Sequence, residues 1–169
     1  MDPAVHQERN VLREQQRSVL LETQGHKMTP YIQNVSLSDV RKGNHIVTGA
    51  SALNSILIQI VDPDIDFPIP AAKFKEVYQF KFLDIEAKDE CENESWRCSQ
   101  DQADLLVSIL QSALHRNLNV IVHCVAGMCR SGAVCEVGVM MGFTDTEVFR
   151  SPNLLVKHQM MKTLGWTYD

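Results

Sequence analysis

The chain has 169 residues, of which 44% are hydrophobic, and its formal net charge is −5. This length and composition are sufficient for one domain with its own core. The negative charge argues against a nucleic-acid groove as the main binding surface. We expect no membrane contact, because no apolar run has membrane-spanning length and no apolar signal region opens the chain. Five cysteines, an odd number, favour a reducing cytoplasm, that of the host if the source is viral.

The chain is expected to begin with an extension. Residues 1–27, rich in Gln, Glu and Arg, favour a polar helical segment, and residues 28–169 would form the domain. Residues 36–39 (Ser-Leu-Ser-Asp) resemble a capping box that opens a short helix, which Gly43 would end. Residues 46–48 (Ile-Val-Thr) then predict a strand.

The middle of the chain shows two further strand patterns. Residues 57–61 form an apolar run, ended by Asp62 and a proline-rich turn. Tyr78, Phe80 and Phe82 alternate with polar or charged neighbours, which is the period of a half-buried strand. Both segments are therefore predicted to join one sheet.

An acidic loop over residues 84–99 separates these strands from a predicted helix. Ser99 or Asp101 would cap that helix, which runs to about His115. Its spacing of apolar residues predicts one buried face, made of Ala103, Leu106, Val107, Leu110 and Leu114.

The last third of the chain predicts strand, helix and helix. Residues 120–122 form a short apolar run, and a helical pattern begins at Gly132. Ser151 and Pro152 are expected to cap and open the last helix, and Gly165 to end it. Strands that alternate with helices predict an α/β domain layered around a small, mostly parallel sheet.

The turn between the predicted strand at residues 120–122 and the helical pattern from Gly132 contains the candidate catalytic residues. Residues 123–132 read His-Cys-Val-Ala-Gly-Met-Cys-Arg-Ser-Gly, with five residues between Cys124 and Arg130. Backbone N–H groups of such a turn can converge on one anion, and the helix behind adds the positive end of its dipole. The same environment lowers a cysteine pKa from about 8.5 to roughly 3.5–7.5. The sequence therefore predicts a phosphate site that contains a nucleophile.

Each side chain of this turn has an expected role. Cys124 would attack phosphorus, and the guanidinium of Arg130 would hold two phosphate oxygens with a geometry that lysine lacks. The hydroxyl of Ser131 would donate to the sulfur and ease its departure, while His123 would brace the loop through its ring nitrogens. The phosphate would be bound by the run Val125, Ala126, Gly127, Met128, Cys129 and Arg130.

This motif resembles the signature of the cysteine-dependent protein tyrosine phosphatase superfamily. The signature is His-Cys, five residues, Arg, then Ser or Thr, and every fixed position is present. The resemblance is to the compact dual-specificity branch, bacterial and phage members included, and extends more weakly from about residue 32 to 165. It implies a single three-layer α/β catalytic domain over residues 28–169. It also implies hydrolysis of phosphotyrosine, and of phosphoserine and phosphothreonine, through a phosphocysteine, without a metal or cofactor.

The mechanism in this family also needs a carboxylate on a loop, acting as acid and then as base. Asp84 continues the alternation of Phe80 and Phe82, so it should lie at the edge of the sheet that holds Cys124. Asp89 is the second candidate. The following residues 91–98 are either a flap over the pocket or an ordinary solvated acidic loop.

Several alternatives stay open at this point. The substrate could be a non-protein phosphoester, such as an RNA 5′ end, a nucleotide or a lipid, or the chain could bind phosphoproteins without turnover. The loop has no Lys or Arg between Cys124 and Arg130, which favours a singly phosphorylated side chain in a protein substrate. Cys129 or Cys135 could protect Cys124 as a reversible disulfide, or simply pack beneath the loop. The physiological substrate and the oligomeric state are not predicted.

Overall fold

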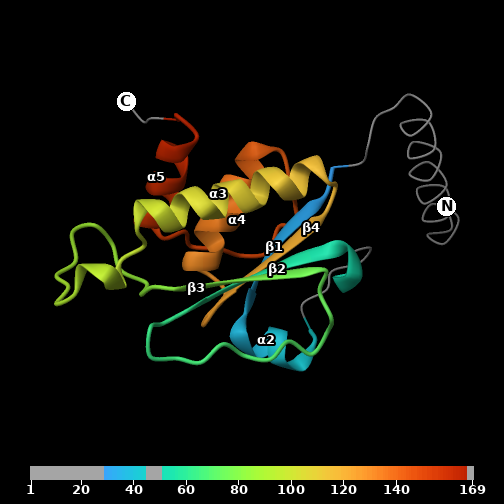
Figure 1. Cartoon of the computed structure of the whole chain (residues 1–169), viewed down its shortest axis with the longest axis horizontal. Coiled ribbons are helices and arrows are strands. Elements are labelled where there is room, and N and C mark those ends of the chain that lie inside the picture. Colours follow the sequence, from blue (N-terminus) through green and yellow to red (C-terminus); the bar gives the residue numbers. More distant parts are fainter. Residues whose placement is uncertain (1–28, 45–50, 167–169) are drawn as a thin grey trace, which may run out of the picture.

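The computed structural model describes residues 29–44 and 51–166, which build one parallel sheet with strand order β3-β2-β4-β1-β5 (Figure 1). The strands are β1 (Tyr31–Ser36), β2 (Ser55–Val61), β3 (Glu76–Lys81), β4 (Asn119–Cys124) and β5 (Thr144–Asp145). The helices are α2 (Leu37–Lys42), α3 (Gln100–His115), α4 (Arg130–Met141) and α5 (Leu154–Thr163). The extension predicted over residues 1–27 and the strand predicted over residues 46–48 lie outside the described residues.

Helices cover both faces of the sheet, so the predicted three-layer α/β architecture is confirmed. Helices α3, α4 and α5 lie on one face, and α2 lies on the other (Figure 1). The larger core joins the sheet to the three helices, and the smaller one, around Val40 and Phe74, lies under α2. None of the described helices is both long and apolar enough to cross a membrane.

The two central strands are apolar along their length because both of their faces are covered. All seven residues of β2 are buried, and so are the last five of β4. At the edge, Phe80 and Phe82 are buried while Tyr78 is half-buried, which confirms their predicted alternation. The sheet expected to be mostly parallel is parallel throughout its described strands.

Two predicted helix starts are confirmed by their caps. The Ser36 side chain accepts from the backbone N–H of Asp39, whose carboxylate accepts in return, and Gly43 ends α2 at a φ of 78°. Of the two caps considered for α3, Ser99 is correct, because its hydroxyl accepts from the backbone of Gln102. The predicted buried face of α3 is also confirmed, with Leu114 partly buried at its end.

The predicted cap of the last helix was wrong. Asn153, not Ser151, caps α5, since its side chain accepts from the backbone N–H of Val156 at 3.0 Å. Ser151 stays outside the helix because its own N–H donates to the carbonyl of Met128 at 3.0 Å. Helix α4 also begins two residues before Gly132, at Arg130, which places the arginine at the helix start.

Candidate active site

The predicted phosphate loop lies at the carboxyl edge of the sheet. Cys124 ends β4, which pairs with β1 on one side and β2 on the other. Arg130 opens α4, so residues 125–129 form the turn between strand and helix. Helix α4 has no side-chain cap, so the side chain of its N-cap residue does not occupy the anion-binding end of the helix.

Neighbouring segments hold the loop from outside through its carbonyl groups. Four carbonyls accept hydrogen bonds of 2.7–3.2 Å, and the pairs are Val125 with Leu37 N, Gly127 with Asn34 Nδ2, Met128 with Ser151 N, and Cys129 with Asn153 N. In a trans peptide the next N–H points away from the carbonyl. The N–H groups of Ala126, Met128, Cys129 and Arg130 therefore face the inside of the loop.

Glycine is required at position 127. Its φ is 77°, in the left-handed region, and a Cβ there would lie 2.4 Å from the carbonyl carbon of Val35. Asn34, which is 1% exposed, fixes the same peptide by donating to the carbonyl of Gly127. The loop is thereby pressed against the end of β1.

The Cys124 sulfur is surrounded by donors. Its Sγ lies 3.1 Å from Ser131 Oγ and accepts from the N–H of Gly127 at 3.2 Å. Burial of this thiol raises its pKa, but hydrogen bonds from Ser131 and Gly127 and the charge of Arg130 outweigh burial. The pKa of Cys124 is therefore below its ordinary value.

The buried thiols outside the loop behave in the opposite way. Burial raises the pKa of Cys98 and of Cys135 to about 12. Cys135 points away from the loop, its Sγ lying 3.7 Å from the carbonyl of Ile32 in β1. Burial and the charge of Asp84 likewise raise the pKa of Cys129, so Cys124 alone among these four is favoured as a thiolate.

This difference predicts selective alkylation. A group with a lowered pKa ionises at a lower pH, so iodoacetamide at mildly acidic pH should modify Cys124 before Cys98, Cys129 or Cys135. Peptide mapping by mass spectrometry would measure the order, and inorganic phosphate should slow the modification of Cys124 specifically. Equal rates for Cys124 and Cys135 would contradict an ionised sulfur in the loop.

The Arg130 side chain is anchored on one edge and open on the other. Its Nη1 donates to Asp62 Oδ1 at 2.6 Å and to the carbonyl of Phe82 at 2.8 Å. Arg130 is only 4% exposed, and within the described part of the chain its Nε is buried without a hydrogen-bond partner. A buried donor without a partner is costly, and a bound oxyanion would satisfy it.

Two residues next to the predicted nucleophile Cys124 in space are fully buried. Ser131 contributes the hydroxyl beside the sulfur, and it is 0% exposed in the first turn of α4. His123 is also 0% exposed, with its Nδ1 3.2 Å from the carbonyl of Cys124. Both side chains thus contact the predicted loop at its base.

Asp84 lies beside the loop, although it is separated from it in sequence. Asn153 Nδ2 donates to Asp84 Oδ1 at 2.7 Å and to the carbonyl of Ile85 at 3.1 Å. The backbone N–H of the same Asn153 donates to the carbonyl of Cys129 at 3.0 Å. One buried asparagine therefore connects the carboxylate to the phosphate loop.

The second candidate carboxylate shapes the acidic loop instead. Asp89 Oδ2 accepts from the N–H of Glu86 at 2.7 Å. The Glu86 carboxylate in turn accepts from Leu154 N and Leu155 N, both at 3.0 Å, at the start of α5. Arg97 donates to the carbonyls of Glu86 and Asp89. Residues 86–89 are thus docked onto α5, while residues 92–95 of the same loop are exposed.

Sequence reasoning missed two residues that hold the site. Asp62 was interpreted only as the end of a strand, but it pairs with Arg130. The expected cap at Ser151 would put Asn153 inside the last helix, but Asn153 itself caps α5 and holds Asp84. The position of Asp62 could have indicated its role. It directly follows a strand and lies at the same edge of the sheet as Cys124, where functional groups gather in parallel sheets.

The described residues offer no site for a metal ion. Among residues 29–44 and 51–166, no group of three or more His, Cys, Asp and Glu side chains could hold one. Cys91 Sγ donates to the carbonyl of Asn93 at 2.8 Å, in the acidic loop. The raised pKa of Cys98 keeps its thiol protonated, which disfavours it as a ligand.

Two human structures share the fold. Human DUSP28 matches with a TM-score of 0.52 and 14% identity, covering 79% of this chain and 91% of its own. Human tyrosine phosphatase-like serine/threonine/tyrosine-interacting protein matches with a TM-score of 0.53 and 16% identity over the same shares. The tyrosine phosphatase OH1 from the Orf virus matches with a TM-score of 0.43 and 20% identity, covering 67% of this chain and 57% of its own.

The fold is therefore shared with these two human structures, as the resemblance of the loop motif to the compact dual-specificity phosphatases implied. No protein-family model matches the sequence, and no curated protein matches it either. At such low identity the likeness concerns the fold, and the activity has to be argued from the site itself.

Proposed function

We propose that this protein is a phosphatase that hydrolyses phosphotyrosine, and also phosphoserine and phosphothreonine, through a phosphocysteine intermediate. The observation that carries the proposal is the arrangement around one sulfur. Cys124 has a lowered pKa, inward N–H groups surround it, and Arg130 presents an unpaired buried edge. These groups match a phosphoryl group in charge and geometry.

In the first step the Cys124 thiolate attacks phosphorus. The S–P bond forms while the P–O bond to the substrate breaks, and Asp84 gives a proton to the leaving oxygen. Arg130 and the loop N–H groups hold the three remaining oxygens as charge redistributes. Asn153 is the positioning residue that keeps Asp84 near the loop.

In the second step water hydrolyses the phosphocysteine. The ionised Asp84 takes a proton from the water molecule. The oxygen of this water forms a bond to phosphorus while the S–P bond breaks. The Ser131 hydroxyl, 3.1 Å from the sulfur, donates to it as it leaves as a thiolate. Phosphate is released, and the sulfur and carboxylate return to their starting states without a metal or cofactor.

The charges around the site support a protein substrate over a polyanion. The turn after β2 carries Asp62, Asp64 and Asp66, and residues 84–97 hold six acidic and two basic side chains. Such a rim repels the extra phosphates of an RNA end, a nucleotide or an inositol lipid. A phosphorylated side chain brings a single phosphate to the loop.

A binding module without turnover is the second candidate, since the fold is shared with a phosphatase-like interacting protein. The residues at the site favour an enzyme. A module that only binds phosphate needs neither an activated sulfur nor a carboxylate held beside the loop, and this chain has both. Hydrolysis of p-nitrophenyl phosphate and of phosphopeptides in the presence of a chelator tests the proposal. A protein that binds these phosphopeptides but releases no phosphate would be a binding module.

The effect of Asp84→Asn on the rate of hydrolysis should depend on the leaving group of the substrate. We expect a loss of about 10²-fold or more for alkyl phosphates, which need protonation, and a small loss for p-nitrophenyl phosphate. Steady-state kinetics with both kinds of substrate would measure the two losses.

The rival carboxylate provides the comparison for this experiment. Asp89→Asn removes an acceptor for the N–H of Glu86 and should leave the leaving-group dependence unchanged. If Asp89→Asn instead slowed alkyl phosphates far more than p-nitrophenyl phosphate while Asp84→Asn did not, Asp89 would be the acid.

A further inference from the structure

A cavity lies beside the proposed phosphate site and has no role in the chemistry described above. It has a volume of about 350 Å³ and is lined by Pro63, Asp64, Leu83 and Trp96. Three of these side chains are apolar, and among the described residues that line it Asp64 alone is charged. Such a cavity is large enough for one amino-acid side chain and combines an apolar wall with one carboxylate.

Its walls continue from the residues that hold Arg130. Pro63 follows Asp62, which pairs with Arg130, and Leu83 follows Phe82, whose carbonyl accepts from the same nitrogen. The cavity therefore lies at the carboxyl edge of the sheet, on the β3 side of the phosphate loop. A peptide with its phosphate on Arg130 would bring a neighbouring residue to this cavity.

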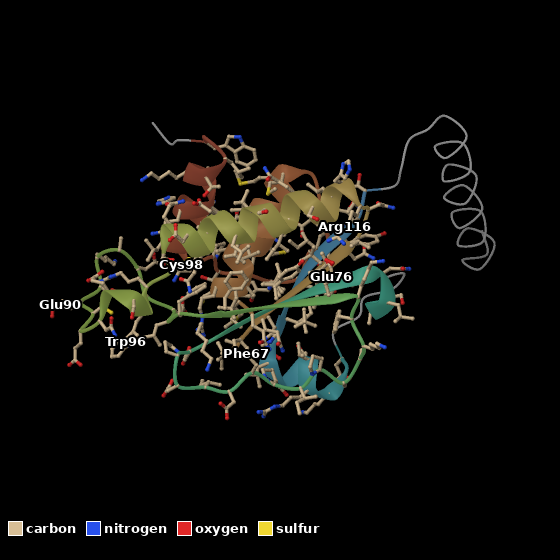
Figure 2. All side chains as sticks on the ribbon, in the orientation of Figure 1. Phe67, Glu76, Glu90, Trp96, Cys98 and Arg116 are labelled. Carbon is tan, nitrogen blue, oxygen red and sulfur yellow. The ribbon has the colours of Figure 1, made fainter. Side chains whose placement is uncertain are left out.

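The segments that form the cavity are held in place. Lys81 Nζ lies 5.2 Å from the ring centre of Phe67, in the turn that carries Asp64. Gln59, buried in β2, donates to the carbonyl of Pro68 at 2.9 Å. On the other wall, the N–H of Leu83 donates to the carbonyl of Trp96 at 2.7 Å. Figure 2 shows Trp96 on the loop after β3 and Phe67 on the turn after β2.

The surroundings select the charge of the occupant. Asp64 is exposed at the cavity, and Asp66 follows in the same turn. Glu90, Glu92 and Glu94, together with one cation, Arg97, line a hollow on the same acidic loop as Trp96. An alkyl stem with a cation at its end satisfies this combination, because the stem packs on Trp96 and Pro63 while the cation meets Asp64.

We infer that this cavity binds a lysine or arginine side chain next to the phosphorylated residue of the substrate. The inference rests on the proposed phosphatase function and narrows its substrates to phosphopeptides with a basic neighbour. An aliphatic residue next to the phosphorylated one would contact the apolar wall of the cavity but make no ion pair with Asp64. An acidic residue there would be repelled by the Asp64 carboxylate.

Phosphotyrosine peptides that differ at one position test this inference. An alanine-based series would carry a single Lys, Leu or Glu at each of the two positions on either side of the phosphotyrosine. At one of these positions the Lys peptide should have the highest kcat/KM and the Glu peptide the lowest. Asp64→Asn should reduce kcat/KM for that Lys peptide about two- to fivefold, as expected for an exposed ion pair, and leave the Leu peptide unchanged. Asp64→Lys should reverse the order of the Lys and Glu peptides.

Two controls separate the possible failures. Asp66→Asn removes an exposed carboxylate that does not line the cavity, and the preference for lysine should persist in it. p-Nitrophenyl phosphate has no neighbouring residue, so its turnover should be the same in Asp64→Asn and in the unmodified protein. Equal kcat/KM for Lys and Glu peptides would overturn the inference while phosphatase activity stands. Failure to hydrolyse any of these esters would instead overturn the proposed function, and binding of the peptides to Cys124→Ser would still report on the cavity.

Discussion

Cys124→Ser should abolish turnover while the phosphate site stays intact. A serine hydroxyl is a far weaker acid than the Cys124 thiol, whose pKa is lowered, so the activated nucleophile is lost and we expect kcat to fall by about 10⁴-fold or more. Apart from the N–H of Gly127, which donates to the sulfur, the loop and Arg130 are held by Asn34, Asp62 and the backbone rather than by Cys124. Phosphopeptide affinity should therefore persist, as measured by isothermal titration calorimetry.

Cys91→Ser is the matched control for this substitution. Cys91 lies in the acidic loop, where its thiol contacts the carbonyl of Asn93, and serine can make the same contact. Activity should be retained in this variant. If Cys124→Ser kept measurable turnover, or if both variants lost it alike, the phosphocysteine mechanism would be wrong.

Arg130→Lys should be the second most damaging change, although it preserves the charge. The guanidinium donates from Nη1 to Asp62 and to the carbonyl of Phe82, while its Nε is buried without a partner among the described residues. A lysine ammonium is a single point and cannot keep both anchors and also hold two phosphate oxygens. We expect kcat/KM to fall by about 10²- to 10³-fold, the usual cost of losing donors to transition-state charge.

The same substitution elsewhere in the chain controls for a general effect. Arg116 makes a two-point ion pair with Glu76 at the amino end of β3, far along the strand from Phe82. Arg116→Lys should leave kcat/KM unchanged within about twofold, since exposed ion pairs contribute little. An Arg130→Lys variant as active as Arg116→Lys would contradict the role assigned to the guanidinium.

Features set by local chemistry could be predicted from the sequence. The caps at Ser36 and Ser99 depend on residues three positions apart, and the central strands depend on continuous burial. The loop between Cys124 and Arg130 was identifiable because its chemistry constrains adjacent residues. These parts needed no knowledge of how distant segments meet.

Features set by distant partners could not be predicted. Sequence patterns predicted no strand over β1, because Gln33 and Asn34 interrupt its apolar run, yet Asn34 is buried there to hold the loop. Strand β5 has only two residues, too few for a period. The pairing of Asp62 with Arg130 joins residues 68 positions apart. Ser151 has the composition of a helix cap, but its N–H is taken by Met128.

The outward hydrogen bonds of the phosphate loop couple ligand affinity to global stability. Donors from β1, α2 and residues 151–153 must all be in place before the inward N–H groups converge, so an oxyanion recognises the native chain and not the unfolded one. Mass action then raises the unfolding free energy by about 2.7 kcal/mol at a phosphate concentration of a hundred times Kd. If the proposed function is correct, we expect phosphate, the reaction product, to be both a competitive inhibitor and a thermal stabiliser of the domain, so that the melting temperature depends on the buffer anion.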